Sequence, residues 1–97
     1  MWLGKVIGQV ISTAKDESLS GMKLLVVDEV EHTRPDGGTG RSHVAVDLVG
    51  AGQGELVLVA AGSAARVADV VSRSPVDQAV IAIADTVVVD GDVTYQK

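Results

Sequence analysis

Residues 47–66 read Asp-Leu-Val-Gly-Ala-Gly-Gln-Gly-Glu-Leu-Val-Leu-Val-Ala-Ala-Gly-Ser-Ala-Ala-Arg, and they contain the end of one apolar strand, a glycine loop and a second apolar strand. The first strand covers residues 43–49 and the second covers residues 55–60. The loop between them has glycine at positions 50, 52 and 54, and each glycine frees the backbone to adopt a positive φ or to pass close to another chain. Ser63 is placed to cap a short helix over residues 64–67. The loop therefore brings backbone close to backbone and supplies neither a nucleophile nor a base.

The rest of the chain predicts further short strands. Residues 1–12 and 22–30 read as strands that precede the glycine loop. Residues 79–89 form the longest β-type run, which the polar pair Asp85-Thr86 breaks. Asp90-Gly91 is a hairpin-type turn, after which residues 93–95 return as a short final strand. Five or six strands with one short helix predict an all-β fold, a small OB-like barrel, in a single domain over residues 1–97. Spacing alone fits other small barrels too.

The strand at residues 22–30 is expected to need a second apolar surface to cover its outer face. Its residues 24–27 are Leu-Leu-Val-Val, so both of its faces are expected to be buried. A small barrel buries only the inner face of a strand. A neighbouring subunit is the simplest cover for the outer face.

Composition excludes several classes of function. Trp2 and Tyr95 are the only aromatic residues in 97, so the core consists of Val, Ile, Leu and Ala and offers little to stack on a base or a sugar. The formal net charge is −5 and the basic residues are scattered, which argues against a nucleic-acid partner. There is no cysteine for a disulfide or a thiolate metal site. No apolar run reaches the roughly 18 residues that span a membrane, and no signal peptide is recognisable, so a cytoplasmic protein is expected.

Residues 31–42 form the most polar segment and are expected to be an exposed, mobile loop that tolerates change. His32 and His43 flank it, with Asp28, Glu31 and Asp36 nearby. Their spacing matches no common ligand pattern, so we expect solvated side chains and no metal site.

Four motifs, in order, resemble one known family. Val49-Gly50-Ala51-Gly52-Gln53-Gly54-Glu55, then Val57-Leu58-Val59, then Gly62-Ser63-Ala64-Ala65-Arg66 resemble the EutN/CcmL family of proteins, which cap the vertices of bacterial microcompartment shells. Residues 5–10 with Thr13, residues 19–25 and residues 75–87 resemble its first, second and last core strands. The resemblance covers most of the chain. It departs mainly at residues 31–42, whose length and glycine content do not align.

The resemblance implies a function and a set of positions. Members of the EutN/CcmL family form homopentamers that plug the fivefold corners of an icosahedral shell beside hexameric or trimeric shell proteins, and the resemblance implies the same for this chain. The glycine loop, Gly50, Ala51, Gly52, Gln53, Gly54 and Glu55, would line the narrow axial opening, where five backbones converge. Ser63, Arg66, Asp85 and Thr86 are expected at the contact between subunits. The implied location is the microcompartment shell.

No residue pattern indicates catalysis or a cofactor. The glycine loop lacks the lysine of a phosphate loop, and its glycines do not have the dinucleotide-binding spacing. Ser63 has no histidine in a recognisable triad. A structural shell protein, not an enzyme, is thus the first hypothesis. The alternative is an OB-like module that binds an oligonucleotide or oligosaccharide, and a small enzyme ranks third.

Overall fold

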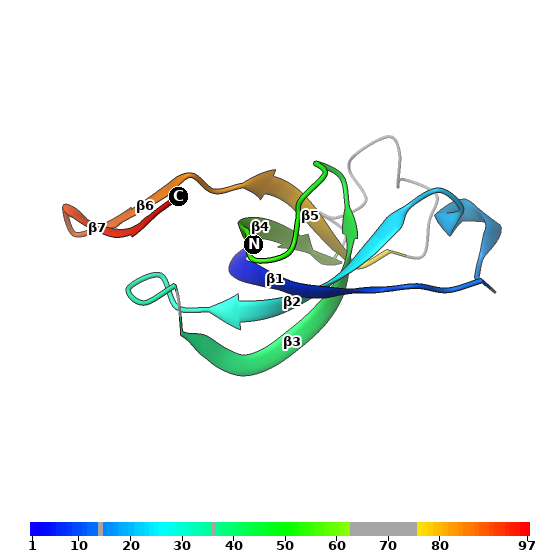
Figure 1. The fold of residues 1–97 in the computed structure, drawn as a ribbon, viewed down its shortest axis with the longest axis horizontal. Helices are drawn as coiled ribbons and strands as arrows, with labels where there is room; N and C mark the ends of the chain where they lie inside the picture. Colours follow the sequence, from blue (N-terminus) through cyan, green and yellow to red (C-terminus); the bar gives the residue numbers. More distant parts are fainter. Residues whose placement is uncertain (14, 36, 63–75) are drawn as a thin grey trace.

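The computed structural model describes residues 1–13, 15–35, 37–62 and 76–97 (Figure 1). In these ranges the elements are strands and one 3-10 turn: β1 (Trp2–Val10), η1 (Glu17–Leu19), β2 (Lys23–Val30), β3 (Gly38–Asp47), β4 (Leu56–Ala61), β5 (Gln78–Ile83), β6 (Thr86–Val89) and β7 (Asp92–Gln96). Five strands close into a barrel in the order β1-β2-β3-β5-β4, and β6 and β7 form a separate hairpin. The all-β, OB-like barrel that the sequence predicts is confirmed. The helix predicted at residues 64–67 lies outside the described residues.

The barrel interior is filled by side chains of similar size. Each barrel strand contributes inward residues, and together they form one cluster: Val6, Leu25, Val27, Ala45, Val57, Val59 and Val80. Ala51 of the glycine loop joins this cluster and is only 1 % exposed, so the loop packs onto the barrel. Trp2 packs against the same cluster. Such aliphatic side chains interdigitate closely in protein cores.

The chain covers part of its own outer surface. On the outer side of β2, Leu24 packs with Leu19 and Met22 against Val46, Val76 and Ala79. This contact leaves Leu24 half-buried, so the chain itself supplies part of the cover that was expected from a neighbouring subunit. The cover comes from the turn that precedes β2 in the chain, because that turn folds back over the strand.

Two element boundaries differ from the prediction. Residues 38–42 belong to β3, with Val30 paired to Gly38 and Asp28 to Ser42. The connection between β2 and β3 is thus shorter than predicted, and Pro35 within it is buried. All of residues 38–42 are exposed, which explains why no apolar alternation marks them as a strand. The run at residues 79–89 is divided into β5 and β6 at residues 84–85, next to the predicted Asp85-Thr86 break.

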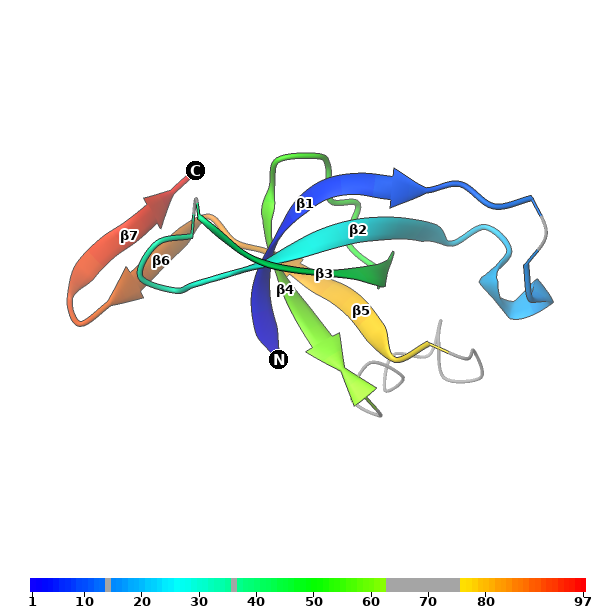
Figure 2. The same cartoon turned by 90° about the horizontal axis from the view of Figure 1, so that it is seen from below.

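The hairpin β6–β7 extends away from the barrel (Figures 1 and 2). Asp90 and Gly91 form its turn with φ of 51° and 81°, which confirms the predicted hairpin. Val87 and Tyr95 pack against an outer cluster of Leu3, Val30 and Leu56 on the barrel. The Thr94 hydroxyl donates to the His32 carbonyl at 2.6 Å, which ties the hairpin to the loop that follows β2. Within the described ranges, no helix is long and apolar enough to cross a membrane.

Candidate functional site

The glycine loop between β3 and β4 is held by the carboxylate of Asp47. One oxygen of this side chain, Oδ1, accepts the backbone N–H groups of Val49, Gly50 and Ala51 at 3.0–3.2 Å. A strand that ends in Asp can thus turn sharply, because the side chain replaces the ladder partners that the backbone has lost. The first half of the loop has a defined shape before any subunit contact.

Glu55 holds the second half of the loop. Its Oε1 accepts the N–H of Gly52 at 2.6 Å, and its Oε2 accepts from Lys97 Nζ at 2.7 Å. The backbone of the loop is also bonded to β1, with the Gly54 N–H donating to the Val6 carbonyl at 2.8 Å and the Val6 N–H to the Glu55 carbonyl at 3.0 Å. The loop is therefore anchored to the barrel at both ends and to the residue that follows β7.

The three loop glycines have different roles. Gly50 and Gly54 have φ of 78° and 87°, which side chains adopt only with strain. Gly52 does not have a positive φ, so the expectation that each loop glycine is needed for a positive φ does not hold at this position. A Cβ at Gly52 would instead lie 3.3 Å from Glu55 Oε1, in the space that its N–H uses to reach that carboxylate.

Lys97 links the glycine loop to the predicted interface segment. Its side chain pairs with Glu55, and its backbone N–H donates to the Asp85 carbonyl at 2.8 Å. Two of the predicted groups, Glu55 and Asp85, are thus brought together by a residue that the prediction did not include. Thr86 is exposed beside Asp85. Ser63 and Arg66, the other two predicted interface residues, lie outside the described residues.

The contact between Glu55 and Lys97 shifts the pKa of both side chains. The hydrogen bond from Lys97, followed by that from the Gly52 N–H, lowers the pKa of the Glu55 carboxyl below its usual value. The hydrogen bond to Glu55 raises the pKa of the Lys97 ammonium. A carboxyl whose pKa is lowered in the folded state stabilises that state above its unfolded pKa, and this contribution is lost as the pH falls through the folded pKa.

Replacing Glu55 with glutamine is expected to reduce the acid sensitivity of the fold. The introduced amide keeps an oxygen for the Gly52 N–H, but the charge that pairs with Lys97 is lost. At pH 7 the variant should melt at a lower temperature than the parent, and this difference should shrink as the pH falls through the folded pKa of Glu55, since the parent carboxyl then becomes protonated. Thermal melting of both proteins over a series of decreasing pH values measures this. A difference that stays the same at every pH would contradict it, because the ion pair would then not be the cause.

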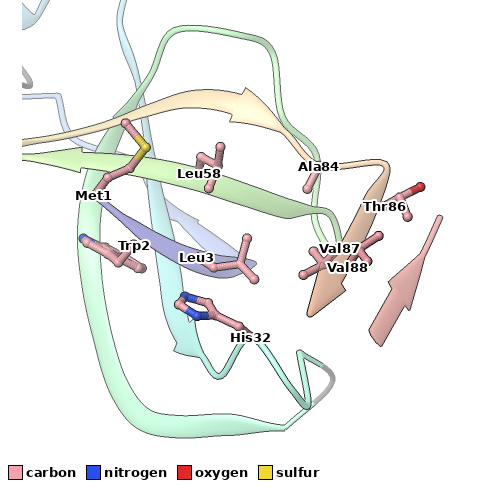
Figure 3. Close-up of a pocket in the computed structure, with 9 residues that line it drawn as sticks. All are labelled: Met1, Trp2, Leu3, His32, Leu58, Ala84, Thr86, Val87 and Val88. Atoms are coloured by element: carbon pink, nitrogen blue, oxygen red, sulfur yellow. The ribbon is translucent and has the colours of Figure 1, made fainter. Parts of the chain in front are cut away.

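A pocket lies where the hairpin leaves the barrel (Figure 3). It has a volume of 390 Å³, and its lining comes from β1, β4, the loop after β2 and the hairpin: Met1, Trp2, Leu3, His32, Leu58, Ala84, Thr86, Val87 and Val88. Val88 at its rim is 59 % exposed. The pocket is open and mostly apolar, and Thr86 is the predicted interface residue that lines it.

His43 contacts side chains from β1 and β2. His43 Nε2 lies 3.0 Å from Glu29 Oε2, and its ring is 4.8 Å from the ring of Trp2. Trp2 Nε1 donates to Gln78 Oε1 at 3.0 Å, so Trp2 bridges β1 and β5 across the sheet. In the described part of the chain, no three His, Asp or Glu side chains gather at one point.

Comparison with known proteins identifies the family. The family model for the ethanolamine utilisation protein EutN and carboxysome proteins matches residues 1–85. The chain belongs to the EutN/CcmL family. A shell vertex protein of bacterial microcompartments, GrpN from Rhodospirillum rubrum, is 56 % identical over 88 residues, which cover 90 % of this chain and 96 % of GrpN. The resemblance found in the sequence is confirmed.

Solved structures of this family have the same fold. CcmL from Gloeobacter violaceus matches with a TM-score of 0.93 at 40 % identity, over 100 % of this chain and 98 % of CcmL. The structure of GrpN from Rhodospirillum rubrum, a pentameric microcompartment shell protein, matches with a TM-score of 0.81 at 50 % identity, over 92 % and 98 % of the two chains. This EutN/CcmL chain therefore has the structural function of a shell vertex protein.

Proposed function

We propose that this EutN/CcmL chain assembles as a homopentamer that occupies the fivefold vertices of a bacterial microcompartment shell. The observation that carries the proposal is the match to the pentameric GrpN, which extends over almost the whole of both chains at 50 % identity. Five copies around an axis form a heterologous interface that closes on itself. Hexameric or trimeric shell proteins would adjoin the pentamer, and the location is the shell within the cytoplasm.

The proposal places the glycine loop at the fivefold axis. Five loops meeting there need short side chains, and residues 50–54 carry only one side chain larger than a methyl group, that of Gln53. Five Glu55 carboxylates in a ring would repel one another. This repulsion is reduced because each Glu55 pairs with Lys97 of the same chain at 2.7 Å. The loop is also bonded internally, so it needs no partner to keep its shape.

The pocket beside the hairpin is the surface that we assign to the neighbouring subunit. A subunit that forms a ring must bury an apolar surface against the next copy, and interface centres are typically apolar. The pocket combines exposed Met1 and Val88 with the predicted interface residue Thr86. Asp85 lies directly beside it along the chain and supplies a polar group for the rim of the same contact.

The assembly state is tested by native mass spectrometry. The purified chain is expected at about 50 kDa, five times the 10.0 kDa subunit, and it should stay there on dilution to micromolar concentration. A stable 10.0 kDa species at that concentration would exclude the vertex function, since a monomer cannot plug a fivefold corner.

We propose no catalytic activity, no nucleic-acid partner and no membrane partner. The alternative, an OB-like module for an oligonucleotide or oligosaccharide, needs aromatic platforms and a basic groove. Trp2 is half-buried and bonded to Gln78, and Tyr95 of β7 is half-buried against the barrel, so both aromatic rings are already engaged within the chain. Retention on immobilised single-stranded DNA at physiological salt would revive that alternative.

A further inference from the structure

Most backbone N–H groups of the glycine loop are already hydrogen-bonded within the chain. The N–H groups of Val49, Gly50 and Ala51 point to Asp47, and that of Gly52 points to Glu55. The N–H groups of Leu48, Gly54 and Glu55 are bonded to the carbonyls of Val80, Val6 and Gly52. Of the eight N–H groups from residue 48 to residue 55, only that of Gln53 has no acceptor among the described residues.

The same bonds turn three of the loop carbonyls outward. In a planar trans peptide, the C=O of one residue points opposite to the N–H of the next. Since the N–H groups of Gly50 and Ala51 point to Asp47, the carbonyls of the exposed residues Val49 and Gly50 point away from it. The Gly54 N–H points to Val6 on the barrel, so the carbonyl of the exposed Gln53 points away from the barrel. Within the described ranges, no donor of this chain reaches those three carbonyl oxygens.

The loop surface is therefore rich in acceptors and poor in donors. Each outward carbonyl presents the negative end of a peptide dipole, and such fixed dipoles act on nearby ions. Both carboxylates that hold the loop are themselves occupied by N–H groups, and Glu55 is also paired with Lys97. Residues 43–65 contain no Lys or Arg, and Lys97, which reaches the loop in space, has its charge paired with Glu55.

We infer that the outward surface of residues 49–54 favours cations and neutral hydrogen-bond donors and disfavours anions. At a fivefold axis, five copies would place these carbonyls around one opening and make it selective by charge. The selectivity of the opening rests on the proposed vertex function, whereas the acceptor character of the loop surface belongs to the single chain.

The natural chain has no cysteine, so one introduced thiol can report on this surface. Gln53→Cys places it at the loop tip, and Gln9→Cys places it at an exposed position of β1 with the same net charge. Each variant is reacted with a trimethylammonium and a sulfonate methanethiosulfonate reagent. The ratio of the two rates cancels differences in accessibility and in thiol ionisation.

The cation-to-anion rate ratio at position 53 is expected to exceed that at position 9 by about fivefold or more, as a local potential of about one kT or more predicts. Equal ratios at the two positions, or a lower ratio at position 53, would overturn the inference.

Oxidative cross-linking of the Gln53→Cys variant tests the placement separately. A disulfide between subunits forms if five loops meet at a narrow axis. A raised rate ratio without any cross-link would support the acceptor surface and overturn its place in the opening. A cross-link without a raised ratio would leave the vertex proposal in place and overturn the charge selectivity.

Discussion

Val88→Asp is expected to convert the pentamer into folded monomers of 10.0 kDa. Val88 lies at the rim of the hairpin pocket and is 59 % exposed in the single chain, so the barrel does not need it to fold. If the neighbouring subunit covers the pocket, the new carboxylate is desolvated in each of the five contacts. Burying one unpaired charge costs several kcal/mol. A loss of about 3 kcal/mol at each contact weakens that contact more than about 100-fold. Native mass spectrometry measures the loss of the pentamer, and circular dichroism measures whether the monomers are folded.

Two matched variants control for other effects of the change. Val88→Thr keeps the branched shape without a charge and should remain pentameric. Ile11→Asp introduces the same charge at an apolar residue that is 82 % exposed just beyond the C-terminal end of β1, and it should also remain pentameric. If Val88→Asp stays at about 50 kDa, five times the 10.0 kDa chain, the neighbouring subunit does not cover this pocket, and the contact lies elsewhere.

The strands of the barrel could be predicted because their side chains alternate between two environments. In β3, for example, Ala45 points into the barrel core, while Val46 packs with Val76 and Ala79 in a separate cluster. The Asp90-Gly91 turn could also be predicted, since its two residues tolerate positive φ. Residues 38–42 carried no such pattern, because that part of β3 is paired through its backbone and buries no side chain. A strand of this kind is indistinguishable from a polar loop in the sequence.

The contacts that shape the glycine loop were harder to predict. The glycines marked the loop, but the groups that hold it are Asp47 at its start and Lys97, which lies 42 positions after Glu55. An Asp at the end of a strand, shortly before Gly, was the available signal for the first contact. Nothing local indicated the second, since it depends on the hairpin returning β7 toward the loop. The division of residues 79–89 into β5 and β6, by contrast, was indicated locally by the polar pair Asp85-Thr86.

Gly4→Val is expected to destabilise the barrel by about 3 kcal/mol or more, at the upper end of the cost of overpacking a filled core. A Cβ at Gly4 in β1 would lie 2.7 Å from the Trp2 ring and 3.1 Å from the Asp28 carbonyl oxygen, in addition to meeting the Val27 side chain. The cost rises because the backbone oxygen cannot move aside as a flexible side chain can. Such a loss is a large fraction of the stability of a small domain, about 5–15 kcal/mol. The midpoint of urea unfolding at a fixed protein concentration measures it.

Gly8→Val is the matched control on the same strand. A Cβ at Gly8 has only the Cβ of Val26 near it, at 4.0 Å, and Gly8 does not have a positive φ. Because a β-branched residue suits a strand and has fewer unfolded conformations than glycine, Gly8→Val should unfold at the same urea concentration as the parent or at a higher one. The difference between the two variants isolates the close approach at Gly4, since the side chain, the strand and the substitution are the same. If Gly4→Val unfolds at the same midpoint as Gly8→Val, then β1, Trp2 and Val27 can separate without cost, and the barrel is not closed tightly at this point.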